Sequence, residues 1–272
     1  MRMRSTIGLL GLVLGPAAMA QEAVNLRIGG QPGQFNRYET VVEIFFRPQQ
    51  MAPMMDPDTN LPLQRMTRFT TRTLTGIVGD TLEFTEVLDS QRMESPAMPQ
   101  MASMMPQMPA GVDTTVQKMN ARGQLFMVDV GNTPIQRDPA QRGQGAGMGR
   151  GMGQRFANAL FALPPRPVRV GESWSDSTTY MTEMGGTNFL ATYTLEQVVN
   201  RGSARVAIIT VNGTQSSSAP AGSVVLSVSG RIQLDVSNGR LAEMEMNMQG
   251  NMNNQQMGGI VPMRIAMKSR LI

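Results

Sequence analysis

Methionine is the residue type whose number and spacing in this sequence could support chemistry. The chain of 272 residues contains 26 methionines, no histidine and no cysteine. Thioethers are soft ligands that select Cu(I), and they bind it without help from histidine. One methionine cluster lies in a Pro-, Gln- and Ser-rich stretch at 96–109, where a role in the core is not expected. The candidate Cu(I) ligands of this cluster are Met98, Met101, Met104, Met105 and Met108.

Two other interpretations of the methionines remain open. Methionine can replace leucine and isoleucine in a core, since Met244, Met246 and Met248 alternate along one predicted strand. Exposed methionines can also act as sacrificial oxidant targets. Cu(I) is therefore an alternative, and the first expectation is a protein without a cofactor.

The residues that are missing exclude several enzyme classes. Without histidine and cysteine the chain has no Ser-His-Asp or Cys-His triad, no Cys/His zinc site and no redox dithiol. Lys118 and Lys268 are the only lysines available for an amine-based mechanism. The formal net charge of +4 falls to +2 once Arg2 and Arg4 are removed, which is too small to indicate nucleic-acid binding. We expect neither an enzyme nor a nucleic-acid partner.

Two short motifs resemble ligand loops without matching them. The segment from Asp56 to Asn60 begins like a calcium loop, but Leu61 stands where glycine is needed, so an Asx-rich turn is expected. The run from Gly143 to Gly153 contains no phosphate-binding glycine pattern and is typical of a linker.

Charged residues are expected on solvent-facing sides of strands. Glu83 and Glu243 fit that position better than the paired acids of a glycosidase. Arg65, Arg68 and Arg72 cannot all share one strand face, and we expect a solvated fringe there.

The elements that would position these residues are β-strands. From Val224 to Val236 apolar residues alternate with polar ones, as in a strand with one buried and one wet face. An Asn238-Gly239 turn leads to the methionine strand, and a last strand alternates from Val261 to Leu271. The better candidates to line an apolar binding site on this face are Leu234, Met244, Met246, Met263 and Ile265.

The two halves of the chain resemble each other. Residues 71–78 align with 192–199, residues 82–91 with 206–215, and residues 117–125 with 233–241. Each half has the order strand, tight turn, strand, loop, strand, glycine turn, strand, which predicts a duplicated antiparallel meander. The sequence therefore predicts an all-β fold, mainly antiparallel, of two similar curved meander sheets with one short helix between them.

Composition divides the chain into five segments. Gly, Arg, Pro and Gln dominate the predicted linker, while Phe156, Leu160 and Leu163 share one face of a short predicted helix that prolines end. The expected segments are a signal peptide at 1–20, an N-terminal β repeat at 21–131, a linker at 132–154, the helix and a Pro-rich strap at 155–175, and a C-terminal β repeat at 176–272.

The Pro-rich strap carries a resemblance to known proteins. Residues 163–174 read LPPRPVRVGESW. They resemble the Leu-Pro-x-x-Pro-Val-x-x-Gly-x-x-Trp segment of exported, β-rich bacterial proteins of unassigned function. The overall architecture is more loosely similar to the periplasmic lipoprotein carriers, which hold acyl chains on the concave face of a curved sheet. That likeness implies a fold and does not fix a function.

The first twenty residues have the features of a secretory signal. A basic start is followed by the apolar run Ile7–Leu14, which is too short to span a bilayer, and by the small-residue cleavage site Ala18-Met19-Ala20. We expect cleavage after Ala20, a periplasmic or extracellular location, and no transmembrane segment in the mature chain.

Three functions remain open. The first is binding of a lipid or another apolar envelope ligand between the sheets, because such sites are concave and mostly apolar. The second is Cu(I) binding by the methionine-rich loop. The third is a structural envelope or interaction protein with a filled core, whose protein partner is unknown.

Overall fold

The computed structural model describes eight segments of the chain. They are residues 22–47, 52–101, 114–130, 133–135, 162–182, 185–219, 222–254 and 259–272. The predicted signal peptide, nearly all of the predicted linker and residues 155–161 of the predicted helix lie outside these residues. The three described residues of the predicted linker form a short strand.

The described chain is almost entirely β-strand, as predicted. Two 3₁₀ turns, η1 (Ala52–Met54) and η2 (Pro99–Met101), lie in the connections. The strands are β1 (Phe35–Phe46), β2 (Gln64–Val78), β3 (Thr81–Glu94), β4 (Thr114–Asn120), β5 (Leu125–Val130), β6 (Thr133–Ile135), β7 (Ser173–Thr182), β8 (Gly185–Arg201), β9 (Ala204–Ala219), β10 (Gly222–Asp235), β11 (Arg240–Asn254) and β12 (Gly259–Leu271).

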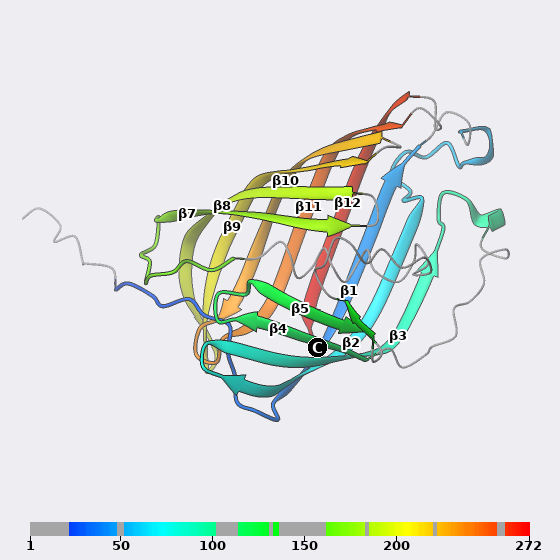
Figure 1. Cartoon of the computed structure of the whole chain (residues 1–272). Helices are drawn as coiled ribbons and strands as arrows, with labels where there is room; N and C mark the ends of the chain where they lie inside the picture. The colour runs from blue at the N-terminus through cyan, green and yellow to red at the C-terminus, as the bar shows by residue number, and fades with distance from the viewer. Residues whose placement is uncertain are drawn as a thin grey trace, which may run out of the picture.

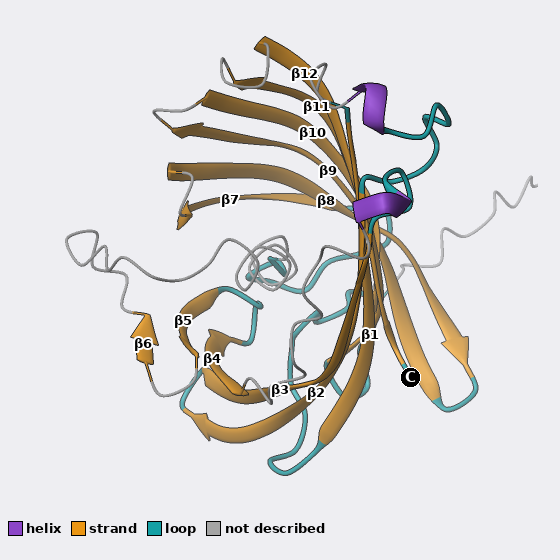
Figure 2. Ribbon diagram, turned by 90° about the vertical axis from the view of Figure 1, so that its right-hand side faces the viewer, coloured by secondary structure: helices purple, strands orange, loops and turns teal. Residues whose placement is uncertain are grey.

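All twelve strands belong to one antiparallel sheet, so the expectation of two sheets is wrong. The strand order is β6-β5-β4-β3-β2-β1-β12-β11-β10-β9-β8-β7. Each half is a meander, and pairing of β1 with β12, for example Val42 with Met267, joins the halves. Nothing local in the sequence reports this long-range pairing. The sheet curves strongly, so that its two edges lie on the same side of the molecule (Figures 1 and 2).

Equivalent strands of the two halves lie six positions apart in this sheet. β2, β3, β4 and β5 correspond to β8, β9, β10 and β11. The hairpin β2–β3 has a bulge between Leu74 and Gly76, and β8–β9 has one between Leu195 and Gln197. The predicted alignment matches these residues to each other.

The predicted alignment of the following strands is wrong by one residue. Leu74 pairs with Phe84, and Leu195 pairs with Ile209, so Phe84 corresponds to Ile209 and not to Ile208. The hairpin β8–β9 extends further beyond its bulge, and both Ile208 and Ile209 are buried. Hydrophobicity alone therefore did not distinguish the two registers, although a slip of one residue exchanges the faces of a strand.

Glycines on the inner, concave face allow close approach of neighbouring strands. A Cβ atom on Gly230 would lie 2.4 Å from the carbonyl oxygen of Glu245, and one on Gly250 would lie 2.0 Å from that of Val225. Glycine within a strand is typical of such close approach and of tight bends. These positions help the C-terminal half to curve.

The main core lies on the inner face of β8–β12. Its side chains alternate with more exposed ones along β10, as predicted, and along most of the neighbouring strands, whereas Val206–Ile209 on β9 are all buried. Two irregular segments, residues 22–34 and 162–172, cover this face near the hairpin turns. Val24 and Val168 pair as an isolated bridge, and both belong to the core cluster together with Leu26 and Leu163.

The outer face carries ion pairs between neighbouring strands. Lys268 lies 2.9 Å from Glu243, and Lys118 lies 2.9 Å from Glu83, so both glutamates have the solvent-facing positions expected of them. The hydrogen bonds that Lys268 donates to Glu245 and Glu243 raise its pKa. Charge on this face is thus largely compensated across strands.

Candidate ligand-binding face of the sheet

The five predicted lining residues all point to the inner face, but they differ in accessibility. Leu234 and Met244 lie near the β10–β11 turn and are 0% and 2% exposed. Met246 and Ile265 are also buried, whereas Met263 is partly exposed. All five belong to or pack against one apolar cluster, so most of them are core residues in this conformation.

One partly accessible region of the apolar inner face lies at one end of the sheet, here called the loop end. It is formed where β1 and β11 finish and where β2 and β12 begin. Ile44, Met66, Met252 and Met263 are partly buried there and pack against the main core. The register brings them together, because Ile44 pairs with Ile265 and Val42 pairs with Met66.

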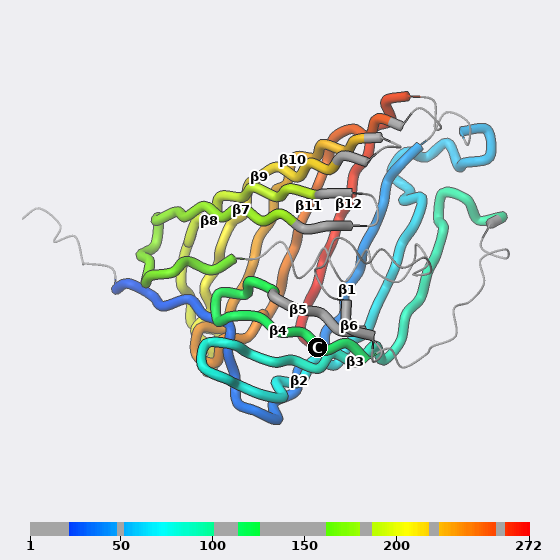
Figure 3. The backbone as a smooth tube through the Cα atoms, viewed as in Figure 1, coloured from blue at the N-terminus to red at the C-terminus, as the bar shows by residue number. Residues whose placement is uncertain are grey.

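The opposite end, here called the turn end, contains the β2–β3, β4–β5, β8–β9 and β10–β11 turns, and irregular segments pass over it. Figure 3 shows the N-terminal segment passing along these turns. The amide of Gly29 donates to the carbonyl of Gly239 at 3.0 Å, and the amide of Ile28 donates to the carbonyl of Ala121 at 2.7 Å. The two covering segments are therefore fastened to the turns and not to the loop end.

Arg122 in the β4–β5 turn connects the covering strap with both halves of the sheet. Its Nε donates to the carbonyl of Leu163 at 2.8 Å, and its Nη2 lies 3.8 Å from Asp176 on β7. Trp174 donates to the carbonyl of Ala162 at 2.8 Å and stacks on Tyr193 with ring centroids 5.6 Å apart. Burial raises the pKa of Tyr193 far above its usual value.

The inner face of the N-terminal half has a different chemistry. Polar side chains there are buried: Gln117 is 0% exposed, and Arg68, Thr70 and Glu86 are nearly as inaccessible. Gln117 Nε2 donates to Glu86 at 3.2 Å, while its Oε1 has no partner among the described residues. A buried polar group without a partner costs free energy, so this face is less optimised for folding alone.

The expectation of a solvated arginine fringe is therefore only partly right. Arg65 lies on the outer face, 2.7 Å from Glu43, whereas Arg68 and Arg72 lie on the inner face. The alternation along each strand indicates the inner face. Arg68 and Arg72 lie an even number of residues from Leu74, and Glu86 lies an even number of residues from Leu82 and Phe84. Sorting faces by hydrophobicity alone assigned these charges to solvent.

The methionine-rich loop is described only in part. Met98 is 3% exposed and packs with Met55 and Ala97 in a small apolar cluster. Met101 ends η2, and Met104, Met105 and Met108 lie outside the described residues, so the Cu(I) hypothesis stays a prediction.

The acidic motif that precedes this cluster forms the expected Asx turns. The amide of Asp58 donates to Asp56 Oδ1, and the amide of Asn60 donates to Asp58 Oδ1, both at 2.8 Å.

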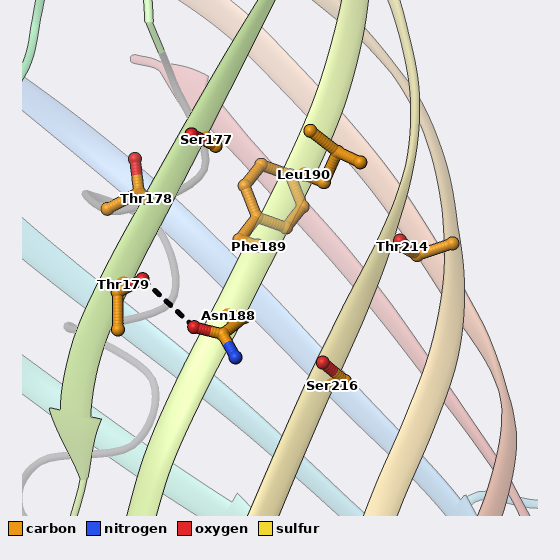
Figure 4. A pocket seen from close by; sticks show the side chains of 8 residues that line it. All are labelled: Ser177, Thr178, Thr179, Asn188, Phe189, Leu190, Thr214 and Ser216. Carbon is orange, nitrogen blue, oxygen red and sulfur yellow. Dashed lines mark hydrogen bonds between the residues drawn. The ribbon is translucent and has the colours of Figure 1, made fainter.

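A depression at the edge of the sheet is lined by Ser, Thr and Asn side chains together with Phe189 and Leu190. It is bordered by residues of β7, β8 and β9, with Thr179 donating to Asn188 at 2.9 Å (Figure 4). None of the five predicted lining residues takes part in it. Its Ser and Thr side chains do not form the apolar site that the sequence predicts.

Two further searches concern only the described part of the chain. There, no three His, Cys, Asp or Glu side chains gather where they could hold a metal ion. No helix in that part is both long and apolar enough to cross a membrane.

Comparison with known proteins gives one similarity. No curated protein and no solved structure matches the chain. Residues 149–260, which include the Pro-rich strap and β7–β11, match the model of a family of unknown function (DUF6263). The match covers less than half of the chain, and the description of that family assigns no activity.

Proposed function

We propose that this is an exported, non-catalytic protein that binds an apolar ligand, such as a lipid, on the inner face of its sheet at the loop end. The observation that carries the proposal is the partial exposure of Ile44, Met66, Met252 and Met263 beside a buried core. Inward-facing apolar side chains that remain accessible gain free energy when a ligand covers them, about 25 cal/mol for each Å² of apolar surface removed from water.

The composition of this surface suits a ligand of variable shape. Methionine is unbranched and flexible, and it is favoured at surfaces that accommodate different apolar partners. The neighbouring core residues Met246, Met248 and Met267 belong to the same apolar cluster. A ligand entering at the loop end therefore meets side chains that can change rotamer at small cost.

The test begins with the mature protein purified from the cell envelope. Organic extracts are examined by mass spectrometry for lipids present in stoichiometric amount. The same protein, after delipidation, is titrated with a fluorescent fatty acid. We expect saturable binding that falls at least fivefold in Met263→Gln and in Met252→Gln.

Matched controls are available on exposed positions of nearby strands. Ile260 is 70% exposed and Val225 is 58% exposed, so Ile260→Gln and Val225→Gln remove similar apolar surface elsewhere. Both variants should bind the probe like the wild type. Lipid-free extracts together with no saturable binding would refute the proposal and favour a structural role with a filled core.

A further inference from the structure

Two arginines flank one buried tyrosine near the turn end of the sheet. Tyr38 on β1 is 8% exposed, and its hydroxyl donates to the carbonyl of Leu241 at 3.2 Å. The strand register places Arg72 on β2 on one side of Tyr38, and Arg240 directly precedes Leu241 on the other side. Burial raises the pKa of Tyr38, and the positive charges of Arg72 and Arg240 oppose that rise. Asn36 connects them, because it pairs with Arg72 across β1–β2 and accepts from Arg240 Nη1 at 3.4 Å.

Among the described residues, Arg72 has only weak partners for its charge. Its guanidinium carbon lies 4.0 Å from the centre of the Phe84 ring, and its Nη2 lies 3.2 Å from the Met119 sulfur. Its Nε is buried and has no hydrogen-bond partner among the described residues. A guanidinium offers five donors in a planar fork that matches a carboxylate or a phosphate. The contacts of Arg72 leave that capacity largely unused.

The guanidinium of Arg240 also makes only weak contacts with the described residues. Its Nη2 lies 3.7 Å from Asp235 Oδ2, a distance beyond that of a hydrogen bond, and its Nε is buried without a partner in the described chain. Its side chain is 30% exposed, so solvent and small solutes can reach it from the turn end.

The acidic groups near these arginines are Glu86 and Asp235. Glu86 pairs in register with Arg72 and accepts from Gln117, and Asp235 accepts from the amide of Ser237 at 3.0 Å. Arg68 lies on the same inner face of β2, beyond Thr70, so the described residues place three guanidinium groups and two carboxylates in this region.

We propose that Arg72 and Arg240, on either side of Tyr38, bind the oxyanion of a ligand, a phosphate or a carboxylate. The two unpartnered Nε donors and the remaining Nη donors would receive its oxygens, and Asn36 and Tyr38 would border it. The oxyanion comes either from a free anion or from the head group of an amphipathic lipid. Met66 and Arg72 share the inner face of β2 and are about 20 Å apart at 3.3 Å per residue, so one extended lipid can reach both. This lipid version also depends on the proposed function.

The experiment is isothermal titration calorimetry on the delipidated mature protein, with inorganic phosphate in one arm and with palmitate in the other. Chloride at equal ionic strength serves as the salt control. We expect saturable binding in at least one arm, reduced at least tenfold in Arg72→Gln and in Arg240→Gln. Arg264→Gln is the matched control, because that guanidinium lies 3.7 Å from the Phe45 ring centre on the outer face. It should change affinity less than twofold.

The pattern of losses identifies the source of the oxyanion. Phosphate binding that is lost in the arginine variants but kept in Met263→Gln supports a site for a free anion. Palmitate binding that is lost both in the arginine variants and in Met263→Gln supports the head group of a lipid. Absence of saturable binding in both arms, or an equal loss in Arg264→Gln, overturns the proposal, even where Met263→Gln still shows that an apolar probe binds. If Arg72→Gln does not fold, Arg240→Gln and the charge-preserving Arg72→Lys provide the comparison.

Discussion

The two halves of the sheet place different chemistry at equivalent positions. Pairing from the shared bulge makes Arg72 equivalent to Tyr193, Glu86 to Val211, and Gln117 to Ile232. In the C-terminal half these positions are at most 1% exposed and form the main core. In the N-terminal half the same inner positions hold polar side chains: Glu86 and Gln117 are buried, and Arg72 is half-buried.

This difference indicates that the apolar inner positions mainly stabilise the fold, whereas the polar inner positions are better suited to binding a ligand. A repeated backbone shows that both sets of residues are compatible with the same curved sheet. The apolar set stabilises the sheet by burial. The polar set requires hydrogen-bond partners that the described chain supplies only in part, as the Gln117 Oε1 and Arg72 Nε atoms demonstrate. We therefore place folding stability mainly in the C-terminal half, and the proposed oxyanion site where the polar inner face of the N-terminal half meets Arg240 on β11.

The strongest test transfers one polar residue into the apolar half. Ile232→Gln copies the residue of the equivalent position, but Ile232 is 0% exposed and is surrounded by core residues. The variant loses buried apolar surface and buries an amide without partners, so we expect a loss of about 3–5 kcal/mol. Urea unfolding followed by circular dichroism measures it.

The control for Ile232→Gln is Val225→Gln on the exposed side of the same strand, which should change stability by less than about 0.5 kcal/mol. A loss below about 1 kcal/mol for Ile232→Gln would mean that the C-terminal half tolerates the chemistry of the N-terminal half. The contrast between the halves would then have no energetic basis.

The second test uses pH, because burial raises the pKa of Tyr193 and of Tyr38. A raised folded-state pKa contributes stability that is present below the unfolded value near 10 and is lost as the pH rises above it. Tyr193, whose pKa is raised far above its usual value, should then cost about 1.4 kcal/mol per pH unit above 10, and Tyr38 should add to this loss. Urea unfolding at pH 9 and pH 11 should therefore differ by at least about 1 kcal/mol.

The double variant Tyr38→Phe, Tyr193→Phe isolates this effect. The double variant should be less stable than the wild type at pH 9. Between pH 9 and pH 11 its free energy of unfolding should fall much less than that of the wild type. An unchanged decline in the double variant would assign it to other groups, such as Lys268, whose pKa is also raised.

The sequence predicted the C-terminal strands well because their alternation is strong. From Val224 to Leu234 every inward position holds an apolar residue or glycine, and the structure buries the apolar ones. The β1–β12 pairing was not predictable in the same way, because it joins residues more than two hundred positions apart. Without that pairing, two meanders are naturally interpreted as two sheets.

The polar inner face was missed for a related reason. Arg68 and Arg72 are charged, and a charged residue on a strand is ordinarily expected to face solvent. Arg68 and Arg72 alternate in phase with the apolar Leu74, which indicates the inner face. The register of β2 with β3 is nevertheless interrupted by a shift at Phe69/Thr70 and by the bulge after Leu74. Of the five predicted lining residues only Met263 is partly exposed, because alternation gives the face of a residue but not what covers it.

A third test makes the N-terminal half resemble the C-terminal one. Gln117→Leu alone removes the donor to Glu86, so we expect a loss of about 1 kcal/mol. The double variant Glu86→Leu, Gln117→Leu removes both partners, and such replacements of buried polar pairs are often neutral or stabilising. It should recover to within about 1 kcal/mol of the wild type in urea unfolding. If the double variant is less stable than either single variant, the polar pair contributes to folding and the division between the halves is wrong.

The smallest expected effect lies at the shared bulge. Its extra residue is Thr75 in the N-terminal half and Glu196 in the C-terminal half, where Glu196 lies 2.9 Å from Arg231 on the outer face. Both partners of this pair are well exposed, so Glu196→Thr should cost less than about 1 kcal/mol. The cost should vanish near 1 M salt, where the screening length is about 3 Å. A cost that persists in high salt would mean that Glu196 stabilises the bulge itself, because only a local backbone effect is independent of screening.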